Sequence, residues 1–217
     1  MKPQPLRVLL VDDHAVVRGG LRRFLEGPNV VCAEAASGEE AYALQAEFAP
    51  DVTVLDLALS GIGGIETLRK ILARDGDAKV LVFSMHDSPS FVQQALRAGA
   101  RGYVTKASTP DVLVQGIEAI AASRRFLSND IAQSVAWSSI KGMPDPLACL
   151  TPREFDLFRM FADGKSIDEI AAITNLSSKT VGNYQTSIRQ KLQLGTSAEL
   201  VRLAIKLGVV SADRPSS

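Results

Sequence analysis

The chain has 217 residues, a length that suits two ordinary domains or one large one. Lys and Arg together number 24, as do Asp and Glu, so the overall charge predicts neither a nucleic-acid partner nor a membrane partner. Cys32 and Cys149 lie far apart and indicate neither a zinc knuckle nor a redox pair, and no apolar stretch approaches the about 20 residues of a membrane span. We therefore expect a cytoplasmic protein without a membrane partner.

The first 125 residues alternate between short apolar runs and amphipathic helical patterns. Such runs are typical of buried parallel strands in a βαβ array. The expected strands cover residues 6–11, 30–35, 52–55, 80–83 and 102–105. Local signals support the helices between them, such as Ser37 with Glu40 at capping-box spacing and Pro89 in a first turn. The sequence therefore predicts an α/β domain over residues 1–125, built on a doubly wound, five-stranded parallel sheet.

The composition changes after Arg125, where the strand signals end. We expect a helix from Ser128 to residue 140 and a linker containing Gly and Pro over residues 141–146, which together make a helical linker over residues 126–149. From residue 150 only helical patterns remain, in four pieces. Helix starts are indicated at Thr151 with Glu154, Ser166 with Glu169, Ser177, and Thr196 or Ser197. Residues 150–217 are therefore predicted to form a small all-α domain.

Polar side chains of different kinds follow four of the expected strands. Asp12 and Asp13 follow the first strand, Asp56 the third, Ser84 the fourth and Lys106 the fifth. In doubly wound sheets the carboxyl ends of the strands form one binding edge, so these side chains are expected to meet there. Helix capping explains most single aspartates after strands, but adjacent acids that face a third repel each other unless a cation joins them. Mg²⁺ binds carboxylates, water and phosphate oxygens, so the set predicts a Mg²⁺-dependent site that places a phosphoryl group on Asp56.

Single positions argue against two classes of enzyme. A phosphatase of the haloacid-dehalogenase kind needs a second acid two residues after its nucleophilic Asp, where Ala58 stands. A Rossmann-type dehydrogenase needs a glycine fingerprint after the first strand, where residues 12–15 are Asp-Asp-His-Ala. We therefore expect no enzyme. His14, at the start of a helix, and His86, in a loop, are expected to be solvated or capping residues.

Four segments resemble the receiver domain of two-component response regulators: Val11-Asp12-Asp13-His14, Leu55-Asp56-Leu57, Ser84-Met85-His86 and Gly102-Tyr103-Val104-Thr105-Lys106. The resemblance runs in order from residue 6 to about residue 125. It implies that Asp56 is the phosphoacceptor and that a sensor histidine kinase supplies the phosphoryl group. It also implies a Mg²⁺ site made of Asp12, Asp13, Asp56 and the Ala58 carbonyl, a switch pair of Ser84 and Tyr103, and Lys106 as the cation that contacts the phosphate.

Residues 170–198 contain Lys179, Arg189 and Lys191 but no acid, in a chain that is neutral overall. Ala171, Asn175 and Val181 have the spacing of a helix-turn-helix, in which Asn tolerates a positive φ at the turn. Over residues 178–192, one helix face is apolar and the opposite face holds Lys179, Asn183, Thr186 and Gln190. An ordinary solvated face has similar polarity but usually includes Glu, so the absence of Glu favours double-stranded DNA as the partner.

Further segments resemble the LuxR-type helix-turn-helix: Leu150-Thr151-Pro152-Arg153-Glu154, Ile170-Ala171, Ser177-Ser178-Lys179-Thr180-Val181 and Lys191-Leu192. The whole chain is thus similar to transcriptional regulators of the NarL/FixJ type. This resemblance implies a regulator that is controlled by phosphorylation and binds promoter DNA as a homodimer, with DNA contacts at Lys179, Thr180, Asn183, Thr186 and Gln190.

A regulator that dimerises and binds DNA without phosphorylation is the alternative. A second subunit is expected to dock on the surface around the fourth and fifth helices, or on the last helix through its Leu200, Leu203 and Leu207 face. The linker around Gly142 and Pro144 is expected to be flexible enough for the C-terminal domain to detach.

Overall fold

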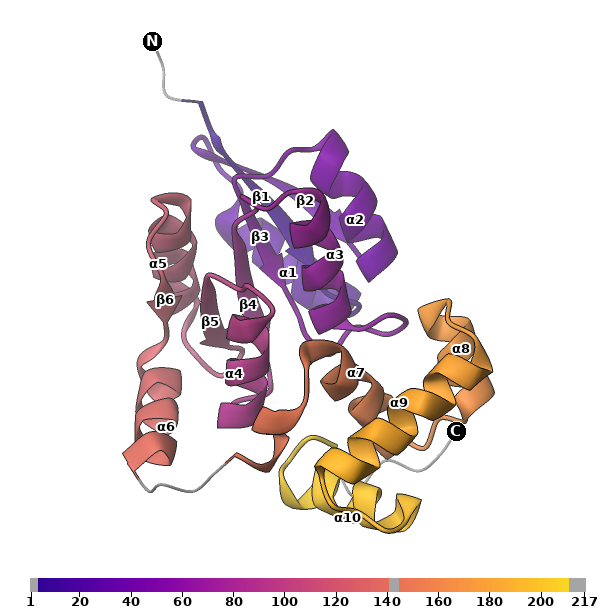
Figure 1. The fold of residues 1–217 in the computed structure, drawn as a ribbon. Helices are drawn as coiled ribbons and strands as arrows, with labels where there is room; N and C mark the ends of the chain where they lie inside the picture. Colours follow the sequence, from indigo (N-terminus) through magenta and orange to yellow (C-terminus); the bar gives the residue numbers. More distant parts are fainter. Residues whose placement is uncertain (1–3, 141–144, 211–217) are drawn as a thin grey trace.

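The computed structural model describes residues 4–140 and 145–210, so the expected flexible segment around Gly142 and Pro144 lies outside the described residues. The chain forms an α/β unit over residues 4–140 and a helical unit over residues 145–210 (Figure 1). The elements of the α/β unit are β1 (Leu6–Val11), α1 (Ala15–Leu25), β2 (Val30–Ala35), α2 (Gly38–Glu47), β3 (Val52–Leu55), α3 (Gly64–Arg74), β4 (Val80–Ser84), α4 (Pro89–Arg97), β5 (Gly102–Thr105), α5 (Pro110–Ala121), β6 (Phe126–Leu127) and α6 (Asn129–Ile140). The helical unit contains the 3₁₀ helix η1 (Pro146–Cys149), α7 (Pro152–Ala162), α8 (Ile167–Thr174), α9 (Ser178–Lys191) and α10 (Ser197–Lys206).

The strands form one parallel sheet in the order β2-β1-β3-β4-β5-β6, which confirms the expected doubly wound α/β fold. Alternate residues of the buried strands point to opposite faces. On β1, Val8 and Leu10 belong to the apolar cluster shared with α1 and α5, whereas Leu9 and Val11 belong to the cluster shared with α2, α3 and α4. Helices therefore cover both faces, and the carboxyl ends of the strands remain as the edge where polar groups gather.

The short strand β6 extends the sheet beyond the five strands that the sequence predicts. Phe126 and Leu127 pair in parallel with Gly102 and Tyr103 of β5. A Cβ atom at residue 102 would lie 2.6 Å from the Phe126 carbonyl oxygen, so glycine permits this close approach. A strand of two residues is too short to produce an apolar alternation, which is why the sequence pattern misses it.

The helical unit begins its helices where the capping signals place them. Thr151, Ser166 and Thr196 each form a complete capping box, and the Ser177 side chain accepts a hydrogen bond from the backbone N–H of Thr180. Asn175 ends α8 in the left-handed conformation, with φ 56° and ψ 39°, as expected for the turn of a helix-turn-helix. Within the described part of the chain, no helix has both the length and the apolar character that crossing a membrane requires.

The helical unit packs on the α/β unit through η1 and α7, and we call this contact the docked interface. In Figure 1, α7 lies between α4 and the remainder of the helical unit. Phe91 of α4 meets Phe155 of α7 edge to face, with ring centroids 5.0 Å apart. The buried amide of Gln94 donates hydrogen bonds to the carbonyl oxygens of Leu147, at 3.0 Å, and Leu150, at 3.1 Å. Apolar packing and satisfied backbone groups therefore hold the two units together.

Charged groups extend the docked interface to the loop between β3 and α3. Arg153 of α7 lies 3.2 Å from a carboxylate oxygen of Glu66 on α3. Arg159, six residues further along α7, donates a hydrogen bond of 3.0 Å to the backbone carbonyl of Leu57. Leu57 directly follows Asp56, so α7 contacts the backbone next to the acid that ends β3.

Replacing Gly64 with Ala is expected to destabilise the chain by about 1–3 kcal/mol. A Cβ atom there would overlap the Asp56 carbonyl oxygen and lie 2.5 Å from the Leu57 Cα. Gly20→Ala is the matched control, because Gly20 is an exposed residue inside α1 with nothing within 4 Å of the added methyl group. It should stabilise the chain by about 0.5–1 kcal/mol. Urea unfolding of both variants measures the change in the free energy of unfolding. Equal changes would show that the close approach at Gly64 leaves room for a methyl group.

Candidate functional site

An ion-paired cluster lies at the carboxyl ends of β1, β3 and β5. Asp12 and Asp56 are 3% and 2% exposed. Lys106, which follows β5, places its Nζ 2.6 Å from a carboxylate oxygen of each acid. Burial alone would lower the pKa of Lys106, but its hydrogen bonds to Asp12 and Asp56 hold that pKa above the ordinary value. The parallel register thus brings together two acids and an ammonium that lie far apart in sequence.

Asp13 lies at the edge of this cluster. One of its carboxylate oxygens accepts a hydrogen bond of 3.1 Å from the backbone N–H of Ser60, and the other lies 2.8 Å from Nδ1 of His14. The His14 side chain is 68% exposed, so the expectation of a solvated residue is confirmed, although its ring also contacts the acid.

The oxygen donors of the cluster suit a magnesium ion. Asp12, Asp13 and His14 can present ligand atoms within 4.8 Å of one another, and the buried carboxylate of Asp56 shares the Lys106 ammonium with Asp12. Ala58 lines the adjoining cavity together with Asp13. Carboxylate and carbonyl oxygens are the hard ligands that Mg²⁺ prefers, so these residues fit the ion.

Ser84 on β4 pairs with Thr105 of β5, two residues beyond Tyr103 on the same strand, and both Ser84 and Tyr103 are fully buried. The Ser84 hydroxyl accepts a hydrogen bond of 3.4 Å from the backbone N–H of His86. The Tyr103 hydroxyl donates a hydrogen bond of 2.6 Å to the His86 carbonyl oxygen, and burial raises the pKa of this phenol. Tyr103 therefore already occupies an inward position.

The expectation of a solvated or capping His86 is wrong. Its ring stacks on Phe91, with centroids 3.9 Å apart and the planes within 2° of parallel. Burial, together with the nearby positive charge of Arg159, lowers the pKa of His86 to about 4. The sequence signal is misleading here because the residues that cover this loop come from α4 and α7 rather than from its own neighbours.

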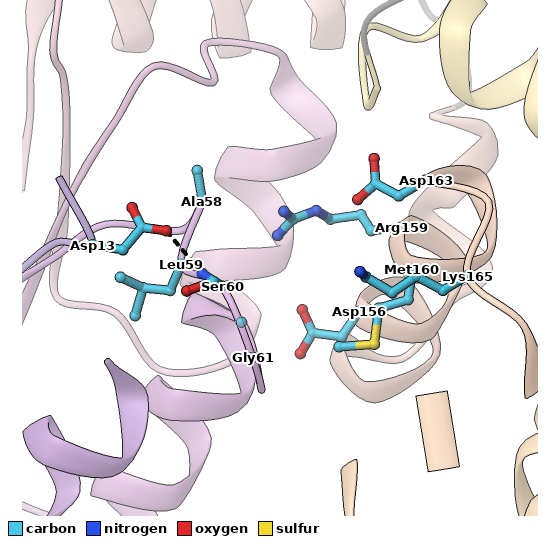
Figure 2. A pocket seen from close by; sticks show the side chains of 11 residues that line it. Asp13, Ala58, Leu59, Ser60, Gly61, Asp156, Arg159, Met160, Asp163 and Lys165 are labelled. Atoms are coloured by element: carbon cyan, nitrogen blue, oxygen red, sulfur yellow. Dashed lines mark hydrogen bonds between the residues drawn. The ribbon is translucent and has the colours of Figure 1, made fainter. Parts of the chain in front are cut away.

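A cavity of about 230 Å³ separates the loop after β3 from α7. Figure 2 shows Asp13 and the Ala58–Gly61 loop on one side and Asp156, Arg159 and Met160 of α7 on the other. The sequence does not indicate Asp156 or Arg159 as functional candidates, because polar residues on a helix are usually solvated. α7 is buried on two sides, against α9 and α10 and against the α/β unit.

The proposed DNA-facing side of α9 is exposed in the docked chain. Val181 and Ile188 are fully buried, whereas Lys179, Asn183, Thr186 and Gln190 are exposed, as the helical pattern predicts. Among the described residues, Lys179, Asn183 and Gln190 have no side-chain hydrogen-bond or ion-pair partner. The other candidates have local partners. The Thr186 hydroxyl donates to the Gly182 carbonyl, and the Thr180 hydroxyl lies 2.8 Å from that of Ser177.

Three further hydrogen bonds hold α9 in place. Glu154 of α7 is 5% exposed and accepts hydrogen bonds from Ser187, at 2.9 Å, and Lys191, at 2.7 Å, both on α9. Burial alone would raise the pKa of Glu154, but these bonds hold it below the ordinary value. Arg189 donates a hydrogen bond to the Gly195 carbonyl beyond the helix. The spacing of Thr151 and Glu154 in the sequence indicates that Glu154 caps α7, but it does not indicate that Glu154 also binds α9.

Much of the expected docking face on α10 is covered in the docked chain. Leu200 and Ala204 are 1% and 0% exposed in the core of the helical unit, and Leu207 packs against the same core. Leu203, the third residue of the expected face, is half-buried, so α7 of the same chain covers most of the face, and docking of a second subunit there stays a prediction.

Two family descriptions match the chain. The description "Response regulator receiver domain" matches residues 8–118, and "Bacterial regulatory proteins, luxR family" matches residues 148–204. The first match contains the cluster around Asp56, and the second contains α7, α8 and α9.

Individual proteins are similar over most of the chain. Response regulator UvrY of Escherichia coli (strain K12) is 37% identical over 98% of this chain and 99% of its own. The crystal structure of a LuxR-family two-component response regulator from Aurantimonas sp. SI85-9A1 has 50% sequence identity and a TM-score of 0.61, and the match covers 63% of this chain and 99% of that one. RcsB of Salmonella enterica serovar Typhimurium, bound to the promoter rprA in the presence of the phosphomimetic BeF3-, shares the fold with a TM-score of 0.73 at 23% identity, over 95% of this chain and 100% of that one.

The chain therefore belongs to the NarL/FixJ-type two-component response regulators, which are transcription regulators rather than enzymes and combine a receiver domain with a LuxR-type DNA-binding domain.

Proposed function

We propose that this response regulator takes a phosphoryl group from a sensor histidine kinase onto Asp56 and, once phosphorylated, binds promoter DNA as a dimer. The observation that carries the proposal is the Lys106 ammonium, 2.6 Å from both Asp12 and Asp56. A fixed cation in a buried site stabilises the charge of a transferring phosphoryl group more strongly than it would in water. The same ammonium offsets the repulsion between the two buried acids before transfer.

The residues around Asp56 divide the remaining roles. Asp12, Asp13, Asp56 and the carbonyl of Ala58 would hold Mg²⁺, and the bound ion neutralises negative charge on the phosphoryl oxygens. Lys106 would exchange its contact with the Asp56 carboxylate for one with a phosphoryl oxygen. The Ser84 hydroxyl, buried one strand away, would donate a hydrogen bond to another of these oxygens.

The docked interface gives phosphorylation a route to the helical unit. A phosphoryl group on Asp56 adds about −1.5 to −2 charge beside the loop that α7 contacts. Leu57 holds Arg159 through its carbonyl oxygen, and Ala58 lines the same cavity as Arg159. Rearrangement of this loop around Mg²⁺ and phosphate would therefore change the contact that retains α7. Because Tyr103 is already inward, this loop is a more direct route than a rotation of Tyr103.

Dimerisation would follow from separation of the units. In the docked chain, α4 contacts α6, η1 and α7, so much of the surface around α4 is covered. Separation would uncover it for a second copy of the chain. A single recognition helix buries too little surface for tight specific binding, and paired half-sites supply the rest. RcsB shares this fold, and its structure contains both promoter DNA and a phosphomimetic, which supports a link between phosphorylation and DNA binding.

A regulator that binds DNA without phosphorylation is the second candidate, and one observation favours it. Lys179, Asn183 and Gln190 are exposed while the two units are docked, so separation is not needed to uncover them. Under this alternative, the α/β unit would act as a constitutive dimerisation module.

Asp56→Ala is expected to abolish phosphorylation by acetyl phosphate in the presence of Mg²⁺, because the nucleophilic carboxylate is lost. Intact-protein mass spectrometry measures the phosphate adduct. Asp75→Ala is the control, since Asp75 is exposed at the end of α3 and should leave the adduct unchanged. An adduct of normal yield on the Asp56 variant would place the phosphate elsewhere.

Asn183→Ala is expected to weaken binding to a preferred DNA sequence by about 1–3 kcal/mol and to relax specificity, because an amide can pair with a base edge. Lys179→Ala should weaken binding to all DNA sequences alike if the ammonium contacts phosphate. Arg189→Ala should change specificity little, because this side chain is bound to Gly195. Fluorescence anisotropy compares DNA selected by the unaltered protein with a scrambled duplex. Equal losses on both duplexes would show that Asn183 does not read bases.

Phosphorylation is expected to raise the dimer population and the affinity for selected DNA together. Analytical ultracentrifugation with and without phosphodonor measures association, and the Asp56→Ala variant controls for unspecific effects of the donor. A rise in DNA affinity with no change in association, on or off DNA, would contradict the coupling through dimerisation.

A further inference from the structure

Asp156 is a buried acid of the docked interface with no partner. The residue is 2% exposed, and both carboxylate oxygens are buried without a hydrogen-bond partner among the described residues. It projects from α7 toward the start of α3, where a methyl group added to Gly63 would lie 3.8 Å from one of its oxygens (Figure 2). Its burial therefore depends on contact between the two units, and neither the phosphoacceptor cluster nor the DNA face uses it.

The charged groups around Asp156 are engaged elsewhere. Arg153 on the same helix pairs with Glu66 of α3, which also binds Arg69 at 2.8 Å. Arg159 directs its guanidinium to the Leu57 carbonyl and lies 5.6 Å from the centroid of the Phe91 ring. Both arginines thus have partners other than Asp156, although the Arg159 Nε has no hydrogen-bond partner of its own, and no ion pair joins either arginine to Asp156 among the described residues.

Across the cavity, the remaining charges are of both signs. Asp163 and Lys165 follow α7 and are exposed, and Asp13 lies on the opposite wall. His86, the titratable group of the β4–α4 loop, is neutral around pH 7 because its pKa is lowered. None of these groups lies within ion-pair distance of Asp156 in the described structure.

A buried carboxylate without a partner is costly, whereas a neutral carboxyl group can be buried at much lower cost. We propose that the helical unit docks on the α/β unit with Asp156 in its neutral form, so that docking takes up one proton and separation releases it. Asp156 is thereby a pH-sensitive element that sets how tightly the two units associate, independently of the phosphorylation state of Asp56.

The direction of the effect follows from the two states of the group. Burial, opposed by the charge of Arg159, raises the pKa of Asp156 in the docked chain to about 7. In the separated helical unit α7 faces water, and the group returns toward its ordinary value of 3.8. The contribution of protonated Asp156 to the docking free energy is fully present below its ordinary pKa of 3.8. It is lost as the pH rises from there to about 7, and above about pH 7 docking changes no further with the pH.

Small-angle X-ray scattering of the full chain between pH 5.5 and 8.5 tests the proposal. The unaltered chain should expand as the pH rises, whereas Asp156→Asn, which is neutral throughout, should remain compact. At pH 8.5 the ratio of docked to separated chains should be at least about tenfold higher for the variant, since one unit of pKa difference corresponds to a factor of ten. His86 and every other titrating group are common to both chains, so their effects cancel in the comparison.

Asp163→Asn is the matched control, because Asp163 is an exposed aspartate at the end of the same helix and lines the same cavity. The Asp163→Asn variant should expand with rising pH as the unaltered chain does. Identical pH profiles of Asp156→Asn and the unaltered chain would overturn the proposal. So would separation of the Asn variant at every pH, which would mean that the ionised group has a stabilising partner such as Lys165.

A second measurement avoids dependence on folding of the variant. Carboxyl ¹³C NMR of the unaltered chain reports directly on the proton of Asp156. A titration midpoint well above the ordinary value, near pH 7, is expected for the docked chain. A midpoint below about 5, near that of exposed aspartates, would refute a neutral Asp156.

Discussion

Charge balance at the carboxyl ends of the strands is the constraint on which the rest of the structure depends. Two buried acids at the ends of β1 and β3 repel each other, and the Lys106 ammonium from β5 neutralises part of that repulsion at 2.6 Å from each. The arrangement exists only because three strands end in register, and the register depends on the apolar faces that α1 to α5 cover. Core packing, rather than local sequence, therefore creates the unusual electrostatic environment of Asp56.

Helix α7 links that environment to α9, the helix that is proposed to face DNA. Its first turn contributes Glu154, which binds Ser187 and Lys191 of α9. The neighbouring Phe155 makes the aromatic contact with Phe91, and Arg159 in the last turn of α7 donates to the Leu57 carbonyl. One helix thus contacts both the loop after Asp56 and α9. Any displacement of α7 from the α/β unit carries α9 with it, because the bonds through Glu154 are internal to the helical unit.

Local interactions explain why much of the fold could be predicted from the sequence. Helix ends depend on residues only a few positions away, as at the capping boxes of Thr151 and Ser166 and at the left-handed Asn175. The apolar runs of the strands indicate their burial directly. The positions of Asp12, Asp56 and Lys106 could also be predicted, because parallel strands bring their carboxyl ends to one edge. The surroundings of His86, Asp156 and Leu200 could not, since each is covered by an element far away in sequence. A polar side chain that a distant helix covers adds no apolar position to the periodic pattern, and a periodic apolar face such as that of Leu200 does not say which element covers it.

The exposure of the α9 face in the docked chain has a consequence for the timing of regulation. On the proposed assignment, Lys179 and its exposed neighbours would meet the phosphate backbone of any duplex while the two units remain together. Weak, sequence-independent contacts of this kind allow a protein to slide and hop along the genome before any signal arrives. On the proposed function, the search for a promoter and the response to a stimulus would then be separate steps.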